Sequence, residues 1–195
     1  MAHEYGTLAA LREKLGLEPT DTSRDTLLTS ALAAASRSID RATGRRFWLD
    51  DTANARVFRT AGRIVREPDG DVLLVDDIGN VDDLVVETGS GTSWTELAGV
   101  ESLPDNALAD GRPITGLLRA GGWGTGRARV TVRWGWPAEP QDITEASLIQ
   151  ASRLYKRKDS PEGIIGSAEW GVRNLSRRDP DVWALIEPFI LPGFG

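Results

Sequence analysis

The chain of 195 residues contains no cysteine and only one histidine. The absence of cysteine excludes disulfides, thiolate zinc sites, iron–sulfur clusters and cysteine nucleophiles. The single histidine, His3, lies near the end of the chain, where side chains are seldom held in place. A Ser-His-Asp triad or a multi-histidine metal site would depend on this residue alone. We therefore expect no catalytic residue, no bound metal and no cofactor.

Long apolar runs are also missing. No stretch approaches the roughly 20 apolar residues that a helix needs to cross a bilayer. The opening MAHEYGTLAALREKLG carries charged residues where a secretory signal requires an unbroken apolar stretch. These features predict a protein that is made and kept in a cytoplasm. The formal net charge of −6 disfavours general coating of DNA, because nonspecific affinity comes mainly from lysine and arginine.

The first part of the chain shows helical spacing of its apolar residues. The leucines of TLAALREKLGL recur three and four residues apart, which predicts a short helix. A second helix is predicted from a cap at Thr22 or Ser23 to a terminator at Gly44. Residues 1–46 are therefore expected to form the first part of a helical bundle.

The middle of the chain changes to short β-rich runs separated by glycine, aspartate and asparagine. We expect a β-rich insertion domain over residues 47–136. Its predicted strands are 55–60, 72–75, 83–88, 93–97, 114–120 and 127–134. The last strand is the clearest, because Arg127, Arg129 and Arg133 alternate with apolar residues that point to the other face.

Helical spacing returns in residues 137–195, which are expected to complete the bundle. DITEASLIQASRLYKRK predicts one helix, and Asp179 followed by Pro180 predicts the start of another that Pro188 ends. A flexible loop is expected between these helices, and an apolar docking tail after them. The predicted fold class is α+β, a small helical bundle interrupted by a β domain.

Charge is segregated along the chain. Between Glu67 and Asp110 there are twelve acidic residues and no lysine or arginine. Between Ala151 and Arg178 there are seven basic residues and three acidic ones. Such segregation suits a surface that meets a complementary surface, although solvated faces produce the same pattern.

Two patterns suggest ligand sites but lack the spacing that such sites require. RAGGWGTGRAR joins two predicted strands and has no Gly-Lys-Ser/Thr, so a glycine-rich hairpin is favoured over a phosphate loop. VDDIGNVDD lacks the alternation and closing glutamate of an EF-hand loop, so its aspartates are expected to face solvent. An enzyme is not expected, because no nucleophile, base and orienting group are placed together.

The arginine strand face offers an alternative function. A nucleic-acid binding module would use Arg127, Arg129 and Arg133, with nearby tryptophans as stacking surfaces. However, Trp134 belongs to the opposite, apolar face of this strand.

The order of these features resembles the head-to-tail connector, or adaptor, proteins of long-tailed bacteriophages. The resemblance rests on several segments, in order along the chain: TLAALREKLGL, ALAAASRSIDRATGRRF, LLVDDIGNVDDLVVE, LPDNALADGRPIT, VRWGWPAEPQDITEASLIQASRLYKRKDSPEGIIG and RRDPDVWALIEPF. It covers nearly the whole chain and includes no catalytic signature.

This resemblance implies a structural virion protein that forms a ring, a dodecamer in the particle, beneath the portal. The ring would contact the portal protein and a head-closure or stopper protein, and genome DNA would pass through its lumen without sequence-specific binding. Localisation would be the virion neck, and the host cytoplasm during assembly. The expected contacts with a sibling subunit or the portal are Arg153, Lys156, Arg157, Lys158, Val182, Trp183, Ile186, Phe189 and Ile190.

Overall fold

A computed structural model describes residues 3–124, 126–157, 164–165, 173–174 and 179–191 of the chain. The chain forms two compact units, Met1–Arg45 with Glu139–Gly195 and Arg46–Ala138. The first is helical and the second is a sheet of antiparallel strands, so the predicted α+β class is confirmed. Most of the expected flexible loop, and the last four residues of the expected tail, lie outside the described residues.

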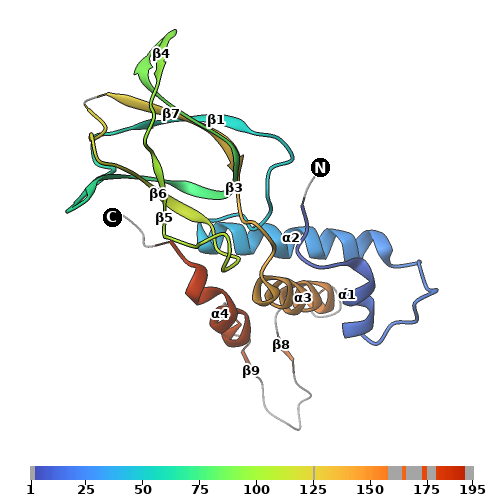
Figure 1. Ribbon diagram of the computed structural model, residues 1–195. Coiled ribbons are helices and arrows are strands. Elements are labelled where there is room, and N and C mark those ends of the chain that lie inside the picture. The colour runs from blue at the N-terminus through green and yellow to red at the C-terminus, as the bar shows by residue number, and fades with distance from the viewer. Residues whose placement is uncertain (1–2, 125, 158–163, 166–172, 175–178, 192–195) are drawn as a thin grey trace. The chain divides into compact units, whose positions relative to one another are not determined.

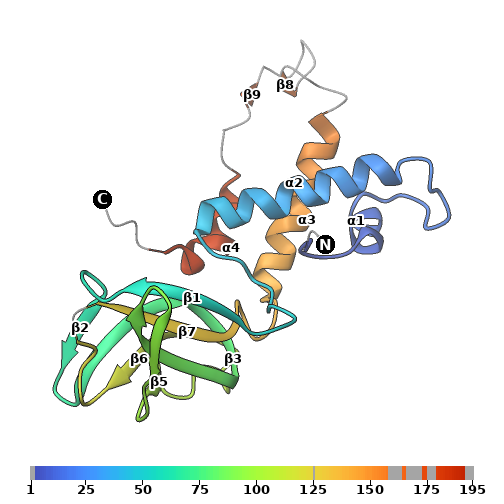
Figure 2. The same ribbon diagram turned by 90° about the horizontal axis from the view of Figure 1, so that it is seen from above.

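The helical unit is built around two long helices that cross each other, as Figure 2 shows. A short helix precedes them and another short helix follows them. The elements are α1 (Leu8–Lys14), α2 (Asp25–Thr43), α3 (Gln141–Lys156), α4 (Pro180–Ile186) and the 3-10 helix η2 (Glu187–Phe189). Two further short strands in this unit, β8 (Ile164–Ile165) and β9 (Arg173–Asn174), pair in antiparallel fashion.

Small residues allow α2 and α3 to approach closely. Ala35 and Ser36 of α2, and Ser147 and Ala151 of α3, are all buried. The hydroxyl oxygens of Ser36 and Ser147 lie 3.3 Å apart, within hydrogen-bonding distance. Because these side chains are short, the two helix backbones can come together, and larger apolar residues on either side complete the core.

The helix ends follow local capping signals, with one correction. The predicted cap of α2 at Thr22 or Ser23 is wrong, because α2 begins at Asp25. The backbone N–H and hydroxyl of Ser23 both donate to Asp21 Oδ1, at 3.0 and 2.5 Å, so Ser23 is held in a turn before the helix. The predicted terminator is confirmed, since Gly44 adopts the left-handed conformation with φ of 69°.

The C-terminal helix starts as predicted. Asp179 Oδ1 accepts hydrogen bonds from the backbone N–H groups of Asp181 and Val182, at 2.9 and 3.3 Å. Pro180 occupies the first helical position, where its missing N–H costs nothing. The α-helix ends at Ile186, and the following turn, which contains Pro188, is η2.

The β unit contains seven antiparallel strands, which curve around one core in Figure 1. They are β1 (Asn54–Arg59), β2 (Ile64–Glu67), β3 (Gly70–Ser90), β4 (Ser93–Glu96), β5 (Glu101–Leu103), β6 (Ile114–Arg119) and β7 (Arg127–Trp134). The predicted strands 72–75 and 83–88 are the two halves of β3, so their separation is wrong. The short strands β2 and β5 were not predicted, because four and three residues carry too little periodicity.

The long strand β3 belongs to both halves of the sheet. Its first half pairs with β2 and β6, and its second half pairs with β7 and β4. The register shifts at several points between Leu74 and Val85, and such irregularities bend a strand. The two halves therefore face each other across a shared core, whose buried members include Phe58, Leu73, Leu117 and Val130.

Side chains join β1 to the β2–β3 hairpin where no backbone ladder is formed. Arg56 Nη1 lies 2.7 Å from Asp76 Oδ2, and Arg63 Nη1 lies 3.9 Å from Asp76 Oδ1. The Arg56 guanidinium also lies over the ring of Trp134, 4.5 Å from its centroid. A single carboxylate thus connects the first strand of the sheet with the opposite half.

Among the helices that the structure describes, none has the length and apolar character required to cross a membrane.

Candidate protein interface

At the basic end of α3, one side chain forms an ion pair within the chain and two are exposed to solvent. Arg153 Nη1 forms an ion pair with Asp179 Oδ2 at 2.7 Å, which connects α3 to the cap of α4. Lys156 and Arg157 are exposed, and neither forms an ion pair with any residue that the structure describes. Lys158 lies outside the described residues. Of the expected basic contacts, Lys156 and Arg157 are therefore the two that are exposed and have no ion pair among the described residues.

The expected apolar contacts also divide into two groups. Val182 and Ile186 are buried, with 8% and 3% of their surface exposed, so they belong to the core of this chain. Trp183, Phe189 and Ile190 are half-buried.

The chain after η2 returns to the end of α2. Leu191 N donates to the carbonyl oxygen of Thr43 at 2.9 Å. The side chain of Leu191 is 42% exposed. The described start of the apolar tail is thus attached to the helical unit and still presents apolar surface.

The arginines of β7 have different environments. Arg129 donates from Nε to Glu87 Oε2 at 2.6 Å and from Nη2 to Glu87 Oε1 at 2.5 Å. Arg133 Nε donates to the carbonyl oxygen of Asp50 at 2.9 Å. Arg127 is exposed and has no ion pair among the described residues. A continuous nucleic-acid stripe is therefore not formed, because Arg129 is neutralised within the sheet.

Glu87 and Arg129 also shift each other's pKa. The hydrogen bonds from Arg129 lower the pKa of the Glu87 carboxyl below its ordinary value. The same bonds raise the pKa of Arg129. The ring of Trp94 stacks on the Arg129 guanidinium, 4.6 Å from its centroid, so the cation is held on two sides.

Three of the four aspartates between residues 76 and 83 contact protein groups, and Asp77 is one of them, since it accepts from the indole N–H of Trp136 at 3.1 Å. Asp76 pairs with Arg56 and Arg63, and Asp82 accepts from the side-chain amide of Asn80 at 2.9 Å. No group of three or more acidic, histidine or cysteine side chains that could hold a metal is found within the described residues.

The glycine-rich segment after β6 is a connection between β6 and β7. Trp123 within it is buried, and its indole N–H donates to the carbonyl oxygen of Asp71 at 2.8 Å. This arrangement fixes the loop to β3.

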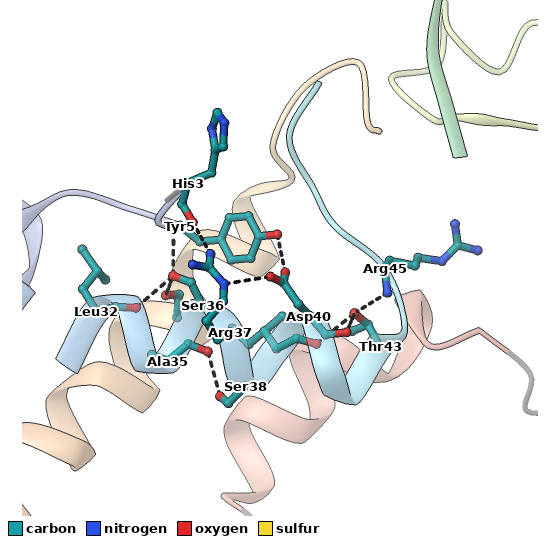
Figure 3. A network of polar contacts seen from close by, with 12 residues as sticks. His3, Tyr5, Leu32, Ala35, Ser36, Arg37, Ser38, Asp40, Thr43 and Arg45 are labelled. Atoms are coloured by element: carbon teal, nitrogen blue, oxygen red, sulfur yellow. Dashed lines mark hydrogen bonds and ion pairs between the residues drawn. The ribbon is translucent and has the colours of Figure 1, made fainter. Parts of the chain in front are cut away.

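A polar network that was not predicted ties the N-terminal segment to α2 (Figure 3). Tyr5 is buried, its backbone N–H donates to Ser36 Oγ at 2.9 Å, and its hydroxyl donates to Asp40 Oδ1 at 2.5 Å. Arg37 bonds both Asp40 and the carbonyl oxygen of His3. In the sequence, only Asp40 could have indicated this network, because it is an acidic residue beside the apolar stripe of the predicted helix. No local pattern indicated that Tyr5 is its partner.

No protein-family model matches this chain, and no curated protein matches it in sequence. Two solved structures contain chains of similar fold. One is the neck of an empty gene transfer agent particle computed with C6 symmetry, with a TM-score of 0.56 and 21% identity over 98% of this chain and 92% of that chain. The other is the virion of a native gene transfer agent particle, with a TM-score of 0.52 and 24% identity over the same shares of the two chains. The resemblance to a neck protein is thus confirmed at the level of the fold, which both units share with chains of these particles.

Proposed function

We propose that this chain is a structural virion protein, a head-to-tail adaptor that forms a ring between the portal vertex and the neck. The observation that carries this proposal is the fold likeness over 98% of the chain to a chain in a particle neck. That likeness includes both the helical unit and the β unit, which interrupts the helical unit along the chain. DNA would pass through the centre of the ring.

The exposed cations of α3 and the C-terminal apolar surface are the proposed portal contacts. Lys156 is the last residue of α3 and Arg157 is its C-cap, a position where a positive charge interacts favourably with the helix dipole. Ile190 and Leu191 follow η2 and remain partly exposed. Arg153, Val182 and Ile186 support this surface from inside the chain rather than contacting the partner.

The test is to mix the full chain with the portal protein of the same particle and to image the complex. We expect a ring of this chain on one end of the portal.

Replacing Lys156 and Arg157 by glutamate should weaken binding to the portal, because opposite charges across an interface would become like charges. The matched control replaces Arg66 and Arg112, two exposed arginines of the β unit, by glutamate. A portal that remains bare at saturating concentrations of the unmodified chain would contradict the proposal.

A further inference from the structure

The outer face of β1, β7 and the second half of β3 combines apolar and basic side chains. Val57 and Val85 are 49% and 38% exposed on this face. Arg59 of β1 lies directly opposite Arg127 of β7, and neither has an ion pair among the described residues. Like charges directly opposite in a sheet are destabilising unless a counter-charge is supplied. We call this the arginine face, defined by Val57, Arg59, Val85 and Arg127.

The arginine face also carries negative charges, but none of them lies beside Arg59 and Arg127. Asp83 of β3 is exposed, two residues before Val85 and six before Gly89, the residue that Arg127 faces. Glu87 neutralises Arg129, as described above. Arg133 bonds a backbone carbonyl and has no ion pair with a described residue. Glu96 lies on the same face but on β4, two strands away from Arg127. No described carboxylate therefore pairs with Arg59 or Arg127.

The other half of the sheet has an outer face of opposite character. Val65, Val72, Leu118 and Glu101 form one row across β2, β3, β6 and β5 by strand register. Val65 is 44% exposed, and Glu101 is exposed with no ion pair in the part of the chain that the structure describes. Glu67, at the end of β2, is likewise exposed and unpaired among these residues. We call this the glutamate face, defined by Val65, Glu67, Glu101 and Leu118. Val72 lies between them in the row but is buried, with 4% of its surface exposed.

Both faces are outer faces because the alternate residues of the same strands enter the shared core. Leu73 and Leu117, which neighbour Val72 and Leu118, are fully buried in that core. Phe58 and Val130 of the other half are buried in it as well. The two faces therefore belong to one compact unit and point away from the same core.

We propose that the arginine face of one copy of this chain binds the glutamate face of a second copy. A second copy is inferred as the partner because the two faces have complementary charge and both carry exposed apolar side chains. One face has two arginines without ion pairs beside exposed valines, and the other has two glutamates without ion pairs beside an exposed valine. The contact is heterologous, since it joins two different patches, and repeated heterologous contacts build a ring when the rotation closes. The inference rests on the proposed function and names the surface by which siblings in the ring would recognise each other.

The natural absence of cysteine permits a direct test with the full chain. One variant carries Val57→Cys and a second carries Val65→Cys, and a short bifunctional thiol reagent is added to each alone and to their mixture. We expect a covalent dimer in the mixture and almost none in either variant alone. Replacing Arg59 and Arg127 by glutamate in the first variant should lower the dimer yield at least about tenfold. Replacing Glu67 and Glu101 by lysine in the second variant should restore the dimer yield with the charge-reversed first variant, because opposite charges would again face each other.

The matched control places the cysteine at Leu27, which is 54% exposed but lies on α2. Mixing L27C with V57C should give only background cross-linking. Equal cross-linking by V57C alone would show an isologous contact and overturn the proposal, as would a mixture no better than the L27C control. DNA binding that is lost in R59E/R127E without any change in cross-linking would assign the arginine face to nucleic acid instead.

These outcomes separate the inference from the proposed function. If R59E/R127E binds the portal normally but the cross-linking result is negative, the sibling contact is wrong and the neck role remains. If the unmodified chain does not bind the portal, the neck role is wrong whatever the cross-linking shows.

Discussion

The guanidinium of Arg129 donates two hydrogen bonds to the carboxylate of Glu87 across neighbouring strands, at 2.5 and 2.6 Å. The two residues are 42 positions apart in the chain, and they face each other in the register of β7 and the second half of β3. Two parallel bonds between a guanidinium and a carboxylate fix geometry as well as charge. This pair therefore fixes the second half of β3 against β7, after the irregular region in which β3 bends.

The Glu87 pair should make stability depend on acid pH. Because the folded-state pKa of Glu87 is lowered by Arg129, its stabilising contribution is complete above the unfolded pKa of glutamate, about 4.3. It is lost as the pH falls through the lower folded value. Urea unfolding between pH 7 and pH 3 should show a smaller acid-induced drop in midpoint for Glu87→Gln than for the unmodified chain. Glu67→Gln, an exposed residue of β2 without an ion pair among the described residues, should retain the full drop. Identical pH profiles for all three proteins would refute the role of the pair.

Replacing Gly135 by alanine should destabilise the β unit strongly. Gly135 has φ of 112°, and a Cβ there would lie 1.8 Å from the carbonyl oxygen of Trp48. Backbone must move to accept it, so we expect a loss of at least about 2 kcal/mol in the free energy of unfolding. Gly91→Ala is the control, because its φ of 59° is also left-handed but no atom lies within 4 Å of the added Cβ. It should cost only about 1 kcal/mol, and equal losses in urea unfolding would rule out the close approach as the cause.

Tyr5→Phe should loosen the N-terminal segment without creating a cavity. The substitution removes the hydroxyl that donates to Asp40 and retains the buried ring. We expect a loss of about 1.5 to 3 kcal/mol in the free energy of unfolding, typical of a hydrogen bond to a charged group. A double-mutant cycle with Asp40→Ala, measured by urea unfolding, isolates the coupling between the two side chains. A coupling energy near zero would mean that the hydroxyl and the carboxylate do not interact.

Two substitutions at Asp179 should separate its two roles. Asp179→Asn keeps a good helix cap and removes the ion pair with Arg153, so the loss should be small, about 0.5 to 1 kcal/mol. Asp179→Ala removes the cap as well and should cost about 1 kcal/mol more. Amide hydrogen exchange in α4 should accelerate in the same order. Equal exchange rates in both variants would show that capping contributes nothing to α4.

Much of the fold could be predicted because its signals are local. The alternation in β7 placed Val130, Val132 and Trp134 on one face, and all three are fully buried. Gly44 and Pro180 act through their own backbone conformations, so their positions at helix ends were readable directly. The cap of α2 was predicted wrongly because Ser23 donates to Asp21 and does not cap the helix. A serine that caps a helix and a serine that bonds a nearby aspartate in a turn look alike in the sequence.

The candidate interface was less predictable than the fold. Charge segregation indicated that surfaces of opposite sign exist, but Arg153 is used within the chain and Val182 and Ile186 are core residues. Arg59 and Val57 were not singled out, because an exposed residue on a short strand has no local signature. Their importance depends on Arg127 and Val85, which other strands bring to the same face.

The sequence by itself determined the two classes of structure, the order in which they occur and the buried face of β7. Periodicity and capping made this possible, because they operate over a few neighbouring residues. Only the tertiary structure decided that residues 70–90 form one bent strand shared by two half-sheets. It also decided that Arg129 is neutralised while Arg59 and Arg127 are not. Strand register sets these pairings, and register depends on packing among segments far apart in the chain, which no local pattern encodes.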